Sequence, residues 1–265
     1  MHPHLAIILL VANLCAACGE PALQVQIPFE ARFSTESISC DEQGDIMLTD
    51  LRFYVSDIQL TDTTGRAHKF DLDRDDIWQQ PNLALLDLEN GRGECVNGTS
   101  EVNNVLRGTI TQGEYSALSF TLGVPFESNH GDPLLATAPL DDAAMHWHWR
   151  GGYKFLRTGV RDSDDSFWLH LGSTGCEGTL QNITGCKAPN RVSVELRDFV
   201  PGRDMVVVDL AELLAGDTLS DKISTDCSSG PAEENCVYAF KALGIDHATG
   251  RADGEQRVFS SALSP

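Results

Sequence analysis

Short segments with the periodicity of β-strands, separated by turn-forming residues, restrict the fold of this sequence most. The first, Leu23 to Phe33, alternates apolar and polar side chains, which is typical of a strand buried on one face. Similar segments rich in β-branched and aromatic residues follow at Ile46 to Leu60, Tyr115 to Val124, Tyr153 to Val160, Phe167 to Leu171, Arg191 to Phe199 and Met205 to Asp209. This pattern predicts an all-β fold, an antiparallel β-sandwich or barrel.

Two segments near the C-terminus favour short helices, Ala211 to Leu214 and Val237 to Leu243. The sequence shows no internal repeat, linker or low-complexity tract. We therefore expect a single β domain over residues 18–265, since all-β domains of this length are common.

The N-terminus predicts export. Leu5 to Ala17 is an apolar run that is too short to span a bilayer and is typical of a signal peptide at residues 1–17. Cys15 to Cys18 looks like a lipobox, in which Cys18 would be acylated. Simple secretion stays open, because Cys15 stands where leucine is usual and residues 2–4 hold no Lys or Arg. The lipobox indicates the periplasm or outer membrane of a Gram-negative bacterium.

The charge of the chain excludes several classes of function. Lys and Arg number 19 against 39 Asp and Glu, a formal net charge of −20. Such a chain is repelled by nucleic-acid phosphates and by anionic lipid surfaces, so membrane contact is expected only through a lipid anchor. Motifs for a nucleophilic serine, a zinc protease or a phosphate-binding loop are missing. We therefore expect a binding protein rather than an enzyme.

The cysteines that follow Cys18 are even in number and predict disulfides in an exported protein: Cys40, Cys95, Cys176, Cys186, Cys227 and Cys236. Sequence alone does not select the connectivity. Pairing within the two close sets closes short loops and would leave Cys40 with Cys95. A thiolate metal site is the alternative, but its usual CxxC spacing is missing after residue 18.

The densest group of metal-binding and oxidisable side chains lies at residues 145–156. In an extended strand, Trp147 and Trp149 would share one face, and His146 and His148 the other. Side chains on one face are about 6.6 Å apart, so two imidazoles at this spacing can reach one metal ion. The competing interpretation is that the indoles fill a core while the imidazoles lie at the surface.

Three ordered segments resemble the MbnP family, also called the metallo-mystery-pair four-Cys-motif proteins, of which MopE and CorA are more distant copper-binding relatives. The segments are GVPFESNHGDP at 123–133, WHWRGGYKF at 147–155 and WLHLGSTGC at 168–176. The resemblance runs from about residue 23 to the end of the chain, and shorter matches support it at residues 50–57, 85–88 and 208–210.

The resemblance implies copper binding outside the cytoplasm. In the family, one tryptophan of the WxW motif is oxidised to kynurenine by a dihaem cytochrome c peroxidase-like (MbnH-like) partner, and the product helps to bind copper. Kynurenine carries an aryl amine and a ketone, and Cu²⁺ prefers imidazole nitrogen with mixed N and O ligands. By position, the resemblance implies modification at Trp147 or Trp149, and ligation by His130 and His170 or, with less support, by His146 and His148.

Two other functions stay open on the sequence. Trp147, Trp149 and Trp168 could form the aromatic platform of a carbohydrate- or protein-binding sandwich. A secreted hydrolase with paired carboxylates is the third hypothesis, because such pairs are defined in space rather than in sequence.

Overall fold

A computed structural model describes residues 21–41, 44–180, 182–214 and 226–265. The predicted signal peptide and the lipidation site Cys18 lie outside the described residues. Strands make up 48% of the described chain and helices only 7%, and the predicted all-β class is confirmed. No helix within these ranges is long and apolar enough to cross a bilayer.

The smaller of the two large sheets has the strand order β17-β16-β1-β8-β5, with β2 paired to β1. Its pairings are antiparallel except between β1 and β16, which run parallel. The strands are β1 (Ala22–Phe33), β2 (Glu36–Ser37), β5 (Asp71–Leu72), β8 (Val105–Thr111), β16 (Asp204–Asp209) and β17 (Phe259–Leu263).

The larger sheet is built around the 16-residue strand β3. Near its start β3 lies between β11 and β7, and towards its end it pairs with β9 and β4. The change of partners coincides with a register shift after Ser56 and with a left-handed φ of 54° at Asp57. The strands are β3 (Met47–Asp62), β4 (Ala67–Lys69), β6 (Gln79–Gln80), β7 (Leu83–Asp87), β9 (Tyr115–Leu122), β10 (His146–His148), β11 (Gly152–Arg161), β12 (Ser166–Gly172) and β15 (Val192–Arg197).

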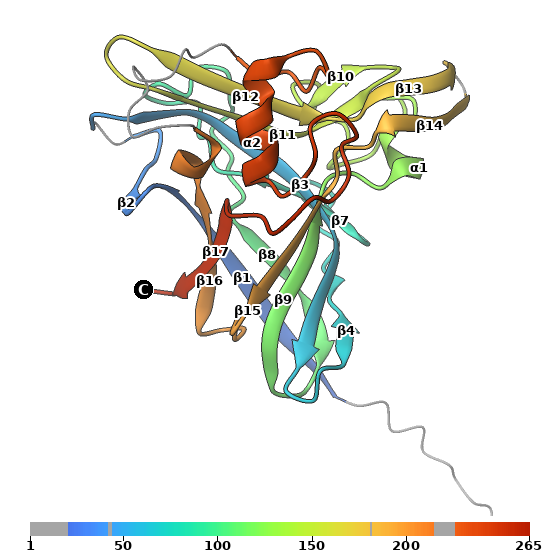
Figure 1. Cartoon of the computed structure of the whole chain (residues 1–265). Coiled ribbons are helices and arrows are strands. Elements are labelled where there is room, and N and C mark those ends of the chain that lie inside the picture. The colour runs from blue at the N-terminus through green and yellow to red at the C-terminus, as the bar shows by residue number, and fades with distance from the viewer. Residues whose placement is uncertain (1–20, 42–43, 181, 215–225) are drawn as a thin grey trace, which may run out of the picture.

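A separate two-stranded hairpin and a few short helices complete the fold. Figure 1 shows β11, β12 and the hairpin across the upper part of the molecule, with the short helix α1 beneath the hairpin. The predicted C-terminal helices are confirmed as a 3₁₀ turn and α2. These elements are β13 (Thr174–Thr179), β14 (Asn182–Ala188), α1 (Phe126–Asn129), α2 (Val237–Ala242) and the 3₁₀ helices Leu210–Leu213 and Glu234–Cys236.

Phenylalanine rings from both large sheets meet in the core. Phe29 of β1 lies 5.8 Å from Phe53 of β3 and 6.1 Å from Phe120 of β9, measured between ring centroids. Phe259 of β17 lies 5.8 Å from Phe53 and 5.5 Å from Phe120. The rings are tilted or edge-on, the arrangement that aromatic quadrupoles favour. The two sheets are therefore joined by one aromatic core, as a sandwich requires.

A buried ion-pair network lies on the strands that carry the candidate site. Asp50 of β3 accepts two hydrogen bonds from Arg52, at 3.0 Å from Nε and 2.6 Å from Nη2. Nε of Arg157, on β11, lies 3.0 Å from Oδ2 of the same carboxylate. The Asp50 and Arg52 side chains are only 1% and 3% exposed. Nearby, burial raises the pKa of Asp87 to about 8.

Three disulfides connect Cys40 with Cys95, Cys176 with Cys186, and Cys227 with Cys236. The pairing that closes two short loops is thus the one observed. Cys176 and Cys186 face each other across the β13–β14 hairpin, and Cys227 forms an isolated bridge with Leu169 of β12. Two of the three disulfides therefore adjoin the strands around the candidate site.

Candidate metal and modification site

The strand that carries the WHW segment is shorter than predicted. β10 ends at His148, and Trp149 lies in the following turn. The turn is tight because Gly152 adopts a positive φ of 80° and the Gly151 amide donates a hydrogen bond to Nδ1 of His148 at 3.2 Å. The alternation expected of an extended segment therefore stops before Trp149, and the two tryptophans lie in different surroundings.

Trp147 is half-buried against β12. A Cβ atom at Gly172 would lie 3.0 Å from Cε3 and Cζ3 of the Trp147 indole, so the indole packs directly over a position that only glycine leaves free. The ring centroid of Trp147 is 5.9 Å from that of His148 and 6.5 Å from that of His170. The ring centroid of Trp168 also lies near His170, at 6.3 Å. The fold therefore brings Trp147 together with two imidazoles.

A cavity of about 210 Å³ opens beside Trp147 and His148. The segment between β12 and β13 forms part of its wall, and so does the first turn after β10. Both segments belong to motifs that the sequence singles out, but the sequence did not indicate that they enclose a cavity. Its lining comprises Trp147, His148, Arg150, Gly151, Ser173, Thr174, Gly175, Cys176 and Ser228.

Trp149 is more exposed than Trp147, and the guanidinium group of Arg150 lies over its ring. Its side chain is 37% exposed, and the guanidinium carbon of Arg150 lies 4.8 Å from the centre of its ring. A cation over an indole face is attracted by the electrons of the ring. The sequence did not predict this contact of Arg150. The contact distinguishes the two tryptophans, because Arg150 lies over Trp149.

His170 has an unpartnered nitrogen in a buried position. It lies on β12, and within the described part of the chain its Nε2 is buried and has no hydrogen-bond partner. Burial, together with the neighbouring charges of Lys154 and Arg157, lowers the pKa of His170 to about 4. A neutral imidazole with a free buried nitrogen suits a divalent metal ion.

The pKa of His170 gives a direct test of these surroundings. The imidazole of the apo protein is expected to titrate near pH 4 in a two-dimensional NMR titration, with His170→Gln used to assign the signal. Because the unfolded chain takes up this proton near pH 6.5 and the folded chain does not, folding stability is expected to fall as the pH drops from about 6.5 to 4. A titration midpoint near pH 6.5 would show that the His170 imidazole is not buried as described.

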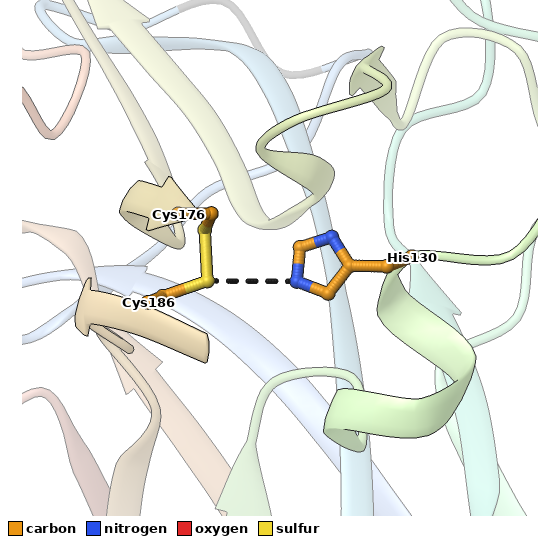
Figure 2. Close-up of side chains that lie close together, drawn as sticks. All are labelled: His130, Cys176 and Cys186. Carbon is orange, nitrogen blue, oxygen red and sulfur yellow. Dashed lines mark hydrogen bonds between the residues drawn. A yellow bond between two sulfur atoms is a disulfide. The ribbon is translucent and has the colours of Figure 1, made fainter. Parts of the chain in front are cut away.

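His130 contacts a disulfide and the Asn129 side chain. It follows α1, and its Nε2 lies 3.5 Å from Sγ of Cys186 and 3.2 Å from the Asn129 side-chain amide. Figure 2 shows the imidazole directed at the Cys176–Cys186 disulfide. His130 as a copper ligand beside Trp147 stays a prediction.

His146 packs against an aromatic ring instead of sharing the site. Its ring centroid is 5.4 Å from that of Tyr153. Burial, followed by the nearby His148 and Lys154, lowers the pKa of His146. His146 as a copper ligand stays a prediction.

Comparison with known proteins places the chain in a family. The sequence model of the MbnP family matches residues 22–229. The chain belongs to the MbnP family. Membership associates it with a methanobactin-related, copper-associated role and fits binding of a metal. The boundary of a single domain at residues 18–265 stays a prediction.

The fold agrees with this MbnP assignment. The chain is similar in structure to MbnP from Methylosinus trichosporium, with a TM-score of 0.78 and 23% sequence identity over 92% of this chain and 100% of that one. No curated protein matches the sequence. At this identity the structural likeness supports the MbnP fold, and the roles of single residues rest on the geometry described above.

Proposed function

We propose that this chain is an exported copper-binding protein in which Trp147 is oxidised to kynurenine by a dihaem peroxidase-like partner, and that the product binds copper together with His170. The observation that carries the proposal is the position of the Trp147 indole beside His170, whose buried Nε2 has no partner among the described residues. His148, which also contacts the indole, is the next available ligand.

The choice of Trp147 over Trp149 follows from their surroundings. Removing one electron from an indole leaves a positive charge on the ring, and the Arg150 guanidinium 4.8 Å from Trp149 opposes that charge. The ring contacts of Trp147 are imidazoles, of which His170 is neutral at pH 7 because of its lowered pKa. Electron loss is therefore easier at Trp147.

The proposed oxidation balances with hydrogen peroxide as the terminal oxidant. The haem partner removes four electrons from the indole and passes them to two molecules of peroxide, which leave as water. The C2–C3 bond of the indole breaks, and each of these carbons gains an oxygen atom from a water molecule; the four protons released in this step are taken up when the two peroxides are reduced to water. Hydrolysis of the resulting formyl group then releases formate and leaves the aryl amine and ketone of kynurenine. The 210 Å³ cavity beside Trp147 offers room for the water and the formate.

The donors of the proposed modified site suit a copper ion. An aryl amine and one or two neutral imidazoles form the nitrogen-rich set that Cu²⁺ prefers. Bound copper would be cargo held for storage or transfer, and in this proposal the chain carries out no turnover. Its formal charge of −20 favours a partner with a basic docking surface, because complementary charge accelerates encounter.

A copper titration tests this function. The protein is expressed with and without the dihaem partner, and copper affinity is measured by competition with a chromophoric chelator. The modified protein is expected to bind one copper ion at least about tenfold more tightly than the unmodified protein, as is usual when a metal site gains support from an added group. Equal affinity of the two forms would contradict the proposal.

A further inference from the structure

A second group of metal-binding atoms adjoins the Trp147 site and shares Cys176 with the wall of its cavity. Cys176 and Cys186 are directly opposite in β13 and β14, and His130 approaches their disulfide from the end of α1. Nε2 of His130 and the two sulfur atoms all lie within 4.8 Å of one another. Figure 2 shows the three side chains converging from separate elements.

This disulfide is more accessible than the other two. Cys186 is partly exposed, and Cys176 is 6% exposed. One cavity, of about 210 Å³, borders Cys176, and another, of about 360 Å³, borders Cys186. The remaining cysteines are 0–2% exposed, namely Cys40, Cys95, Cys227 and Cys236. Because thiol–disulfide exchange requires direct attack on sulfur, an external dithiol reaches the Cys176–Cys186 bond first.

The hairpin can lose this bond without unfolding the core. β13 and β14 form a two-stranded sheet separate from both large sheets. Backbone pairing continues on both sides of the disulfide, from Thr174 opposite Ala188 to Thr179 opposite Asn182. The two sulfurs therefore stay near each other after reduction, and His130 stays beside them on its own element.

We infer that reduction of the Cys176–Cys186 disulfide creates a second metal site, in which the two thiolates and Nε2 of His130 bind Cu(I). A dithiol donates two electrons and two protons to the S–S bond and becomes a disulfide itself. Cu(I) then displaces the two thiol protons and keeps its oxidation state. Thiolate sulfur with imidazole is a donor set that Cu(I) favours, whereas the oxidised disulfide offers no thiolate. The site therefore binds Cu(I) only after the disulfide is reduced.

The chain contains its own comparison site. Cys227, Glu233 and Cys236 also bring their donor atoms within 4.8 Å, with a second short-loop disulfide. This disulfide is almost fully buried, and its third group is a carboxylate, which is a poor ligand for Cu(I). It is expected to stay closed under reduction that opens Cys176–Cys186.

The experiment uses the full chain expressed without any partner, so Trp147 is unmodified and the outcome is independent of the copper function proposed above. Graded dithiothreitol treatment, alkylation and peptide mass spectrometry identify which disulfide opens first. Cu(I) is then titrated against bicinchoninate. We expect Cys176 and Cys186 to be alkylated first, and the reduced protein to bind one more Cu(I) than the oxidised protein.

His130→Ala is the decisive variant, with His68→Ala as its control because His68 is bonded to Asp62 in a distant hairpin. His130→Ala is expected to leave the disulfide reducible, keep the circular dichroism spectrum and weaken Cu(I) binding by about tenfold. His68→Ala should bind Cu(I) as the parent does. The inference is overturned if Cys227–Cys236 opens first, if no further Cu(I) binds, or if both histidine variants bind it equally.

Discussion

Replacing Trp147 with phenylalanine is expected to abolish kynurenine formation and reduce copper affinity to that of the unmodified protein. The indole is the only part of this residue that oxidation can convert into an aryl amine and a ketone. Phenylalanine keeps an aromatic ring over Gly172, so the packing against β12 is largely retained. Intact mass after co-expression and a chelator competition titration report the two losses.

Trp149→Phe is the matched control, because it removes the other indole of the same motif. This side chain is 37% exposed and sits in a turn under Arg150. The variant is expected to form kynurenine and bind copper as the parent protein does. If Trp149→Phe loses both properties while Trp147→Phe keeps them, the assignment is reversed.

Asp50→Asn is expected to lower the free energy of unfolding by about 3–5 kcal/mol, the usual cost of removing one partner from a buried ion pair. The Asp50 carboxylate lies between the guanidinium groups of Arg52 and Arg157, and its side chain is 1% exposed. An asparagine amide keeps the shape but leaves two buried cations without their closest anion. Urea unfolding followed by circular dichroism measures the loss.

A surface ion pair provides the comparison. Glu195 lies 3.3 Å from Arg197, and both side chains are more than half exposed. Glu195→Gln is expected to change the free energy of unfolding by less than about 1 kcal/mol, because exposed pairs gain little over water. An Asp50→Asn variant as stable as Glu195→Gln would show that the network does not hold β3 and β11 together.

The longer strands could be predicted from local alternation or from runs of β-branched and aromatic residues, whereas β8, β13, β14 and β17 were not predicted. Leu23 to Phe33 shows its inward and outward faces in the sequence itself, and the observed strand Ala22–Phe33 agrees. The parallel pairing of β1 with β16 could not be predicted, because it joins segments separated by most of the chain. The spacing of hydrophobic residues along a strand indicates which face is buried, but it does not indicate which strand lies beside it.

The chemistry of the site could be predicted by residue type, but its geometry could not. His170 lies beside Trp147, with 6.5 Å between the ring centroids, and its role as a copper ligand stays a prediction. The different surroundings of Trp147 and Trp149 depend on where β10 ends, which the Gly151–Gly152 turn decides. His130 was grouped with His170 through motif resemblance, whereas the fold directs its imidazole to a disulfide on another hairpin.

The most direct test of the central claim is tandem mass spectrometry of the peptide that contains Trp147 and Trp149, taken from protein expressed with its dihaem partner. The account predicts kynurenine at Trp147 and an unchanged indole at Trp149. Two unchanged indoles, or kynurenine confined to Trp149, would contradict it.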